Sequence, residues 1–415
     1  MSKRWFISGL LLILSTDVPS AMAQGILFPS VGAVNRAMSG ASTAAPLDAA
    51  GATYWNPATI SAFPKQEILV GGDFVYGNTF LATGVVGGTA GENRSDSGLA
   101  AAPVIGIISR PKDSTFTFGL GIYSILGRTI DFRGSETNPI LSPFNPPQSF
   151  GVGPISAELS GLQVSMLMSK QISDTISVGG GLIVNSVSLD LDPAFFATRN
   201  PNGTFPAATN SRPNWGAGFH VGIFYDSRDK WKFGAAFKSQ QRFETFKYNS
   251  KDEIGRAREL DLEFALPSIF TFGVGYQASR STLIAADVRH FNYANTPLFG
   301  HAPVSGGLGW RSIWAFAVGA HHQFNQMVSA QFGYAYSQSP IEDGETIFNM
   351  QLTAVNTSSI SGGVTVALTP SVDIVGSAVY AFEEKSQGTI LQIPGTAIQL
   401  KQSLGTFSLG LRFRL

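Results

Sequence analysis

Few side chains in this sequence are arranged for catalysis or metal binding. The 415 residues contain no cysteine and only five histidines. His321 and His322 are adjacent, and adjacent residues of a strand point to opposite faces, so these two cannot readily hold one metal ion. The glycine run 179–181 lacks the lysine and hydroxyl residue of a phosphate-binding loop. We therefore predict that the protein is not an enzyme and that it holds no metal and no cofactor.

Large apolar side chains in loop-like segments are the more informative residues. Two such segments, 127–154 and 191–211, carry Phe144, Phe150, Leu191, Phe195, Phe196 and Phe205. Exposed apolar side chains are unfavourable in water unless they pack or bind an apolar partner. They are therefore candidates for capturing a hydrophobic small molecule. The alternative is that they pack the loops over the structure beneath, and both roles can hold together.

Basic residues are the candidates for meeting a ligand carboxylate, because charge-assisted hydrogen bonds are strong in a buried site. Five of them are expected to face the interior: Lys238, Arg242 and Arg289, which are the principal candidates, with Arg256 and Arg258. The alternative role is structural. The acidic face of 259–263 is expected to pair with the basic face of 232–242, and Asp287 shares a face with Arg289, which favours ion pairs that brace a wall.

Composition limits the class of protein before any element is placed. Length alone would suggest two or three soluble domains. Charged residues make up only 13% of the chain, about half of the roughly 25% that is usual in soluble domains. The formal net charge is zero, so nothing indicates a nucleic acid as partner.

Residues 1–23 have the pattern of a secretory signal peptide. Lys3 and Arg4 precede an apolar run at 6–15, and Ala21-Met22-Ala23 matches a cleavage site. The apolar run is too short for a membrane helix, which needs roughly 20 residues. A helical anchor is therefore the weaker alternative, and export from the cytoplasm is expected.

From residue 66 onward, apolar and polar residues alternate with a period of two, as in strands with one apolar and one polar face. Fourteen such segments are predicted: 66–78, 98–109, 114–126, 155–170, 174–190, 212–227, 230–248, 256–278, 281–293, 310–323, 327–338, 357–368, 371–384 and 401–415. Most are about ten to twenty residues long, whereas strands of soluble proteins average about five or six.

Short and long connections alternate between these segments. The long connections are 79–97, 127–154, 191–211, 249–255, 294–309, 339–356 and 385–400. Bacterial outer-membrane barrels place tight turns at the periplasmic end and long loops outside. Hydrocarbon offers the backbone no hydrogen-bond partner, so a sheet within it must close on itself. We predict an all-β fold: a 14-stranded antiparallel transmembrane β-barrel over residues 65–415. A soluble sandwich or propeller is the alternative, but it has no reason to sort its loop lengths.

Residues 24–64 precede the first strand and differ from everything after them. Alanine, glycine, serine and threonine dominate the segment, and Arg36 and Asp48 are its only charged residues. Small side chains let a backbone approach a wall closely, while Pro57 and the preceding Asn56 favour a defined turn. Because the lumen of a fourteen-stranded barrel must be occupied or it leaks, we predict that this segment is a plug inside it.

Two motifs carry a resemblance to a known family. The first, in the plug, comprises Asn35-Arg36-Ala37-Met38, Gly40-Ala41, Asp48-Ala49 and Asn56-Pro57-Ala58. The second comprises Leu266-Pro267-Ser268, the segment 272–276 and the segment 283–288. With the loop alternation, they resemble the FadL/TodX family of outer-membrane transporters of hydrophobic compounds. The resemblance implies plug roles for six residues: Arg36, Gly40, Asp48, Asn56, Pro57 and Ala58.

The resemblance also implies a route for the cargo. Outer loops would capture it, a pocket beneath them would receive it, and a kink in the third strand would let it leave sideways into the membrane. In the third strand, 114–126, Gly119 and Gly121 are the candidates for this lateral gate, because glycine weakens the strand ladder locally. Close packing against the plug is the equal alternative. The fourth long connection, 249–255, is short, so the second is expected to help form the capture groove.

The expected function is passive uptake of long-chain fatty acids or similar hydrophobic molecules across a bacterial outer membrane. The expected partners are the cargo, outer-membrane lipid and lipopolysaccharide, and the expected state is a monomer. Uptake of aromatic hydrocarbons is the alternative within transport. An outer-membrane hydrolase that modifies lipids is the alternative from another class, although no nucleophile motif supports it.

Overall fold

The computed structural model describes residues 24–342, 344–390 and 393–415, and its fold is a closed 14-stranded antiparallel β-barrel. The predicted signal peptide, 1–23, lies outside the described residues. The barrel strands are β1 (Glu67–Val85), β3 (Leu99–Ser109), β4 (Phe116–Phe132), β7 (Ile155–Gln171), β8 (Ile176–Asp192), β9 (Asn214–Asp226), β10 (Trp231–Lys238) continued by β11 (Gln241–Phe243), β14 (Ala265–Leu266) continued by β15 (Ile269–Gln277), β16 (Thr282–Phe291), β17 (Ile313–Gln323), β18 (Val328–Ser337), β19 (Ser358–Thr369), β20 (Val372–Gly388) and β21 (Thr396–Arg414). No helix among the described residues is long and apolar enough to cross a membrane.

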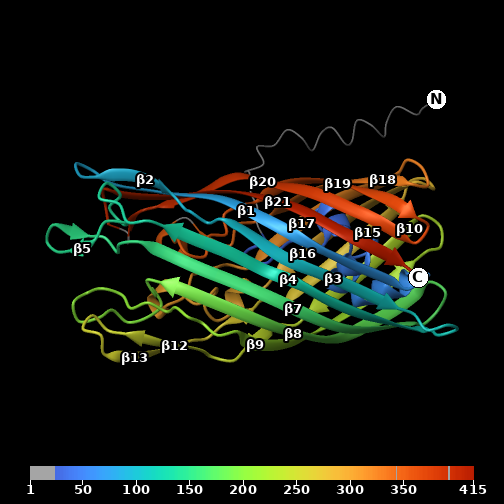
Figure 1. Ribbon diagram of the computed structural model, residues 1–415, viewed down its shortest axis with the longest axis horizontal. Coiled ribbons are helices and arrows are strands. Elements are labelled where there is room, and N and C mark those ends of the chain that lie inside the picture. Colours follow the sequence, from blue (N-terminus) through green and yellow to red (C-terminus); the bar gives the residue numbers. More distant parts are fainter. Residues whose placement is uncertain (1–23, 343, 391–392) are drawn as a thin grey trace.

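Shorter elements occupy the connections and the N-terminal segment. They are α1 (Ala33–Ala37), α2 (Ala49–Trp55), η1 (Pro57–Ala62), β2 (Ala90–Arg94), β5 (Phe144–Asn145), β6 (Ser149–Phe150), β12 (Phe246–Lys251), β13 (Ala257–Leu262), η2 (Tyr293–Asn295), η3 (Pro303–Ser305) and η4 (Thr346–Asn349). Figure 1 shows β2, β5, β12 and β13 at one end of the barrel and the C-terminus at the other. We call these the long-loop end and the short-turn end.

The first and last strands close the sheet. β1 and β21 pair in unbroken antiparallel register from Glu67 opposite Arg414 to Val85 opposite Thr396. The sheet therefore has no free edge along this seam, as hydrocarbon surroundings require. The strand number predicted from alternation is confirmed.

Side chains on the strands alternate between the outer surface and the interior. On β17, Trp314, Phe316 and Val318 are 44–49% exposed, while the intervening Ala315 and Ala317 are buried. Large apolar side chains thus point outward, and small or polar ones point inward. This arrangement is the inverse of a soluble protein and is typical of a transmembrane barrel.

Two predicted strands are wrong in their extent. The barrel strand expected at 230–248 leaves the sheet soon after Lys238, and the one expected at 256–278 joins it only at β14. Between them, β12 and β13 form a separate two-stranded hairpin at the long-loop end. Alternation continues through this hairpin because it too has a buried and an exposed face. The fourth loop is therefore long, not the short 249–255 expected.

The plug lies inside the barrel, where Figure 1 shows it in blue toward the short-turn end. α1 and α2 are buried along their whole lengths. Small side chains permit close approach to the wall: a Cβ at Gly106 of β3 would lie 2.6 Å from the backbone of Ala50. Alanine and glycine in α2 and glycine in the wall thus fit one another.

Buried charges fasten the plug to the wall at two places. Arg36 of α1 forms an ion pair with Asp73 of β1 at 2.7 Å, and both side chains are buried. On the opposite wall, one oxygen of Asp287 accepts hydrogen bonds from the backbone N–H groups of Ser42 and Thr43 at 3.0 and 3.1 Å, and from the Thr43 hydroxyl at 2.7 Å. The charge of Asp73 is therefore matched by Arg36, and one oxygen of Asp287 is held by the plug rather than by water.

Replacing Asp287 with asparagine should loosen the plug while leaving the barrel intact. The change leaves the Arg289 guanidinium, 2.8 Å from Asp287, without its anion, and breaking a buried pair of this kind costs about 3–5 kcal/mol. Hydrogen exchange of the plug backbone around Ser42 and Thr43 should accelerate, while exchange in β17 and β18 stays unchanged.

Asp226→Asn is the matched control, because its pair with Lys232 is 3.5 Å long and partly exposed. Such a surface pair contributes about 0–1 kcal/mol. Equal plug protection in Asp287→Asn and in the wild type would contradict the fastening role of Asp287.

Candidate functional site

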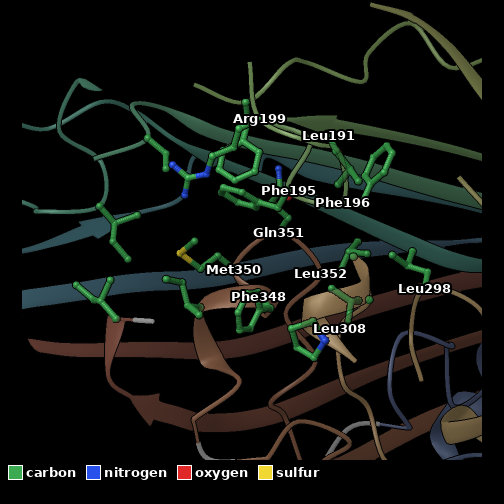
Figure 2. A pocket seen from close by; sticks show the side chains of 18 of the residues that line it. Leu191, Phe195, Phe196, Arg199, Leu298, Leu308, Phe348, Met350, Gln351 and Leu352 are labelled. Atoms are coloured by element: carbon green, nitrogen blue, oxygen red, sulfur yellow. The ribbon is translucent and has the colours of Figure 1, made fainter. Parts of the chain in front are cut away.

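An apolar cavity lies among the loops at the long-loop end. Its enclosed space is roughly 150 Å³. Its walls come from five loops, which include the segments 140–152, 191–205, 298–308 and 347–352. Figure 2 shows Phe195 on one side of it and Met350 and Phe348 on the other. We call it the outer cavity.

Most of the predicted capture residues line the outer cavity. Leu191, Phe195, Phe196, Phe205 and Phe150 are among its walls. Phe144 is not: it lies opposite Phe150 in the short β5–β6 hairpin. The same rings pack the loops together and leave a cavity between them, so neither of the two roles considered for them excludes the other. Phe195 and Phe205, for example, meet edge to face with centroids 5.1 Å apart.

Sequence reasoning missed part of this wall. Leu298, Leu308, Phe348, Met350 and Leu352 also line the cavity, from loops after β16 and β18. These residues follow no strand alternation and no helical period. Their only signal was an apolar side chain within a long loop, the same signal that singled out Phe195.

Arg199 is the one charged side chain in the wall of the outer cavity. Its guanidinium lies 4.4 Å from the ring centroid of Phe205 and donates a hydrogen bond to the Gly203 carbonyl at 3.1 Å. No carboxylate pairs with it in the described part of the chain. Figure 2 places it at the edge of the cavity, above Phe195. Sequence analysis did not single it out, because it lies in a loop outside the alternating segments.

The β12–β13 hairpin packs against the third loop and helps to enclose this region. The Tyr248 hydroxyl donates to the Leu189 carbonyl at 2.8 Å, and Ser250 donates to the Ala207 carbonyl. Arg258 donates to Asn200 at 2.9 Å. The fourth loop thus takes part in the covering structure, contrary to the expectation based on its apparent shortness.

Three of the five basic residues expected in the interior do not face it. Arg242 is exposed, because the strand breaks after Lys238 and the faces exchange, so that Gln241 points inward and bonds Asn185. Arg256 is exposed in the hairpin turn and Arg258 is half buried on the hairpin. The expected pairing of 232–242 with 259–263 is also wrong; the acidic Glu259 pairs with Lys247, at 3.2 Å.

Lys238 and Arg289 are buried inside the barrel. Arg289 binds Asp287 at 2.8 Å and donates to the Gly40 carbonyl of the plug. Its guanidinium also lies 3.6 Å from the ring centroid of Trp55. The ion pair expected between Arg289 and Asp287 is present, and Arg289 contacts the plug as well as the wall.

The plug residues of the family motif make contacts throughout the segment. Asn56 donates from its amide to the carbonyls of Thr43 and of Ile223 in β9, and its oxygen accepts from the Ala58 N–H. Pro57 begins η1, where its missing N–H is not needed. The Ala58 carbonyl accepts from Ser169 of β7 at 3.2 Å. Gly40 has a φ of +86°, which favours glycine.

The third barrel strand, β4, is interrupted close to the plug. Its pairing with β7 shifts register between Ser124 and Leu126, so Ile125 is an extra, bulged residue. On its other side, β4 pairs with β3 only up to Tyr123 opposite Val104. Further along β4, the Asp96 N–H donates a hydrogen bond to the Asp131 carbonyl at 2.8 Å. Between these points β3 and β4 do not pair with each other, although each still pairs with its other neighbour. We call this part of the β3–β4 boundary, residues 99–103 and 124–130, the ladder gap.

The proposed gate glycines lie outside the ladder gap. A Cβ at Gly119 would lie 3.1 Å from the Thr53 methyl group, and one at Gly121 would lie 2.9 Å from the Thr53 hydroxyl. These glycines therefore let α2 of the plug approach β4, the alternative considered for them. The bulge is at Ile125 instead, where the carbonyl accepts from the Phe28 N–H at 2.9 Å.

A second cavity lies behind the ladder gap, between the start of the plug and the wall. Its enclosed space is roughly 90 Å³, and its lining includes Phe28, Arg36, Val75, Gly127 and Arg128. The Gly127 backbone is close to Phe28: a Cβ there would lie 3.0 Å from the end of the phenyl ring. We call it the inner cavity.

Comparisons with known proteins agree with this geometry. The family profile described as "Outer membrane protein transport protein (OMPP1/FadL/TodX)" matches residues 12–392. The solved structures of the toluene transporters TodX of Pseudomonas putida and TbuX of Ralstonia pickettii superpose with a TM-score of 0.69 each, at 16% and 17% identity. A Pseudomonas aeruginosa FadL homologue gives 0.69 at 16%. Each comparison covers 94% of this chain and 99% of the other. At such identities the structures establish the fold alone. No curated protein matches in sequence.

Asp48, at the start of α2, is the plug residue whose titration depends on its surroundings. Its carboxylate caps the helix by accepting from the Gly51 N–H at 2.7 Å. Burial raises the pKa of this carboxyl from 3.8 to about 6, although the Gly51 hydrogen bond acts in the opposite direction. Desolvation therefore outweighs the cap.

The raised pKa of Asp48 predicts that the protein loses stability as pH rises. Asp48 binds its proton more tightly in the folded than in the unfolded chain. The contribution of protonated Asp48 to the free energy of unfolding is therefore full below about pH 4 and falls as the pH rises to about 6. Above that pH it no longer changes. The total change is about 3 kcal/mol. Asn caps helices as well as Asp does, so Asp48→Asn should remove this part of the decline and leave the part due to Glu67, whose pKa burial raises to about 7. The check is the guanidinium unfolding midpoint of both proteins across this range; parallel curves would contradict the assignment.

Proposed function

Because the chain belongs to the OMPP1/FadL/TodX family of outer-membrane transport proteins, we propose that it takes up long-chain fatty acids or similar hydrophobic molecules by passive diffusion. The outer loops capture the cargo, and it leaves sideways into the membrane past the plug. The long-loop end then faces the outside of the cell and the short-turn end faces the periplasm. The observation that carries this proposal is the pair of cavities at the two ends of such a route.

Capture is supported by the chemistry of the outer cavity. Its lining is mainly apolar and aromatic, with Arg199 and Gln351 as polar groups at its wall. Affinity then comes mainly from apolar burial, about 25 cal/mol per Å² removed from water. A polar group at the edge orients an amphipathic cargo rather than supplying most of the binding energy.

Sideways release is supported by the ladder gap and the inner cavity behind it. Val75 of the inner cavity belongs to β1 and lies opposite Ala100 of β3, at one border of the gap. Gly127 and Arg128 belong to β4, at the other border. Pro103, which has no N–H to donate, also lies at the gap. The plug, in contrast, is fastened around the axis of the barrel, so an axial route needs more interactions to break.

Two alternatives are less well supported. Aromatic hydrocarbons are the cargo of the similar TodX and TbuX, according to their names as toluene transporters. Arg199, exposed at the cavity wall, adds a charge-assisted hydrogen bond for a carboxylate and none for a neutral hydrocarbon. A lipid-modifying hydrolase is disfavoured because members of this family are transport proteins. We also propose that the protein is a monomer in contact with lipid and lipopolysaccharide, and that it reaches the membrane after cleavage of its signal peptide.

Blocking the ladder gap should slow release without abolishing capture. In Gly127→Trp the indole must displace Phe28 and occupy the inner cavity. We expect the rate of fatty-acid uptake by cells to fall by at least about tenfold, a barrier increase of about 1.4 kcal/mol. Binding of a fluorescent fatty acid to the purified protein should persist.

Gly405→Trp is the control, because a Cβ at Gly405 would have no neighbour within 4 Å. Both variants must show the heat-dependent gel mobility of a folded barrel. Normal uptake by Gly127→Trp would rule out this exit.

The class of cargo can be identified from the purified protein itself. Mass spectrometry of extracted ligand should detect fatty acids. Arg199→Gln should weaken binding of a fatty acid by roughly tenfold, since a hydrogen bond to a charged group contributes about 1.5 kcal/mol, and leave binding of toluene unchanged. Two results would favour the hydrocarbon alternative: extraction of neutral hydrocarbons from the purified protein, and an equal loss of affinity for the fatty acid and for toluene in Arg199→Gln.

A further inference from the structure

Three basic side chains form a row on the outer surface of the barrel at the long-loop end. Arg94 of β2 lies opposite Phe80 of β1. Phe80 lies opposite Lys401 of β21, which lies opposite Lys385 of β20. Residues directly opposite each other in an antiparallel sheet share a face. This face is the outer one, because the residues that flank Lys401 along β21 are buried. We call Arg94, Lys401 and Lys385 the basic row.

The two ends of the basic row have no carboxylate partner in the part of the chain that the structure describes. Lys401, in the middle, pairs with Glu92 at 2.7 Å. Arg94 and Lys385 are exposed, as is Glu383 at the β20 bulge beside the row. Three cations next to two carboxylates leave a net positive charge. Neighbouring strands are about 4.8 Å apart, so the two end cations are about 14 Å apart across the sheet.

An aromatic band lies directly beneath the basic row. Tyr76 and Tyr380 point outward and are 43% and 49% exposed. In the next row towards the short-turn end, Phe74 and Phe407 lie opposite each other on the same face. Aromatic girdles mark the membrane–water boundary of outer-membrane barrels. Arg94 donates a hydrogen bond to the Tyr76 hydroxyl, so its guanidinium reaches back to this band. The basic row therefore lies at the level of lipid headgroups.

Amide side chains follow on the far side of the basic row. Gln399 and Gln387 lie opposite each other, two residues farther from the membrane than Lys401 and Lys385. Gln399 donates to Gln387 at 3.4 Å. An amide both donates and accepts hydrogen bonds, which suits the hydroxyl groups of sugars. From the membrane outward, this face presents aromatic rings, then cations, then amides.

Other parts of the outer rim do not suit an anionic headgroup. Glu158 of β7 and Asp190 of β8 lie directly opposite each other on the outer face, and the exposed Asp192 follows on β8. Near the start of β9, the charge of Arg212 is matched by Glu244 at 3.3 Å. Like charges repel a phosphate at the first place, and the second has no free cation. Attraction for an anionic lipid is thus confined to one side of the barrel.

We propose that the basic row binds one molecule of lipopolysaccharide, the phosphorylated glycolipid of the outer leaflet. Its acyl chains lie on the band of Tyr76 and Phe74. The disaccharide above them has a phosphate at each end, and Arg94 and Lys385 each donate to one of these phosphates. The sugars beyond meet the amide side chains. This inference rests on the proposed function, which places the long-loop end outside, and adds to it a lipid partner with a defined position.

The test measures how much lipid the full mature protein binds in an uncharged detergent. Lipid A, the membrane-embedded part of lipopolysaccharide, is titrated in its diphosphorylated form and after removal of both phosphates. Native mass spectrometry counts the lipid molecules on each barrel. Divalent cations are left out, because they bridge phosphates to carboxylates. We expect one diphosphorylated molecule to bind, and the dephosphorylated lipid to bind roughly a hundredfold more weakly, tenfold for each charge-assisted bond lost.

The double variant Arg94→Gln with Lys385→Gln removes both end cations and leaves no carboxylate without its partner. It should lower the affinity for diphosphorylated lipid A by roughly a hundredfold and leave that for the dephosphorylated lipid unchanged. The control is Lys251→Gln with Arg256→Gln, which removes two exposed charges from the β12–β13 hairpin and should bind as the wild type does. If the first variant does not fold, as judged by gel mobility, the comparison of the two lipids on the wild type still decides.

Inorganic phosphate distinguishes a lipid site from a site for a free ion. We expect it to displace lipid A no better than chloride at the same ionic strength, because screening acts equally in both. Displacement by phosphate alone would assign the row to a free ion and overturn the lipid site.

The remaining outcomes separate this inference from the proposed function. Equal binding of lipid A by the wild type and the Arg94→Gln, Lys385→Gln variant, or equal binding of the two lipids, overturns the lipid site and leaves uptake intact. Binding of a fluorescent fatty acid is measured on the same samples, and we expect it to be unchanged in the variant. Absence of fatty-acid binding from every sample, with lipid A bound as expected, overturns the proposed function and supports the lipid site.

Discussion

A peptide group within hydrocarbon has no hydrogen-bond partner except another peptide group, and the structure of this protein depends on that constraint. It accounts for the continuous seam between β1 and β21 and for the outward rows of aromatic and aliphatic side chains. It also makes any interruption of the ladder expensive. The bulge at Ile125 is tolerated because the plug supplies the missing donor, from the Phe28 N–H. The interruption of the wall at Ile125 and the plug segment at Phe28 are thus linked by a hydrogen bond.

The interior follows a different rule from the outer surface. Wall charges such as Asp73 and Asp287 are neutralised by Arg36 and by backbone donors of the plug. Where neutralisation is complete, the contact is structural. Lys238 is buried beside the aromatic rings of the plug, and Arg199 is exposed beside Phe205. Neither has a carboxylate partner among the described residues, so charge balance separates the residues that fasten the plug from these two.

The barrel could be predicted from the sequence because lipid on one side of the wall imposes a strict period of two on the apolar residues of each strand. The alternation of short and long loops distinguished the two ends of the barrel. The same period misled at 239–264, since a hairpin that packs on a loop alternates as a wall strand does. The position of Arg242 was predicted wrongly for this reason. Residues 239 and 240 leave the strand ladder, so the inward and outward faces exchange between β10 and β11. No residue type in the sequence marks this interruption. Ile125 and Arg199 carry no local signal either, because a bulge and an unpaired charge are defined by neighbours distant in the chain.

The pairing of the first strand with the last also determines when the molecule can be finished. Glu67 meets Arg414 across the whole length of the polypeptide, so the cylinder cannot be sealed until synthesis and export have delivered the final residues. Loop closure over so many residues is entropically costly and slow. The plug precedes β1 in the chain, so it is made before the seam can form. Until then both outer strands remain open edges that other chains can join.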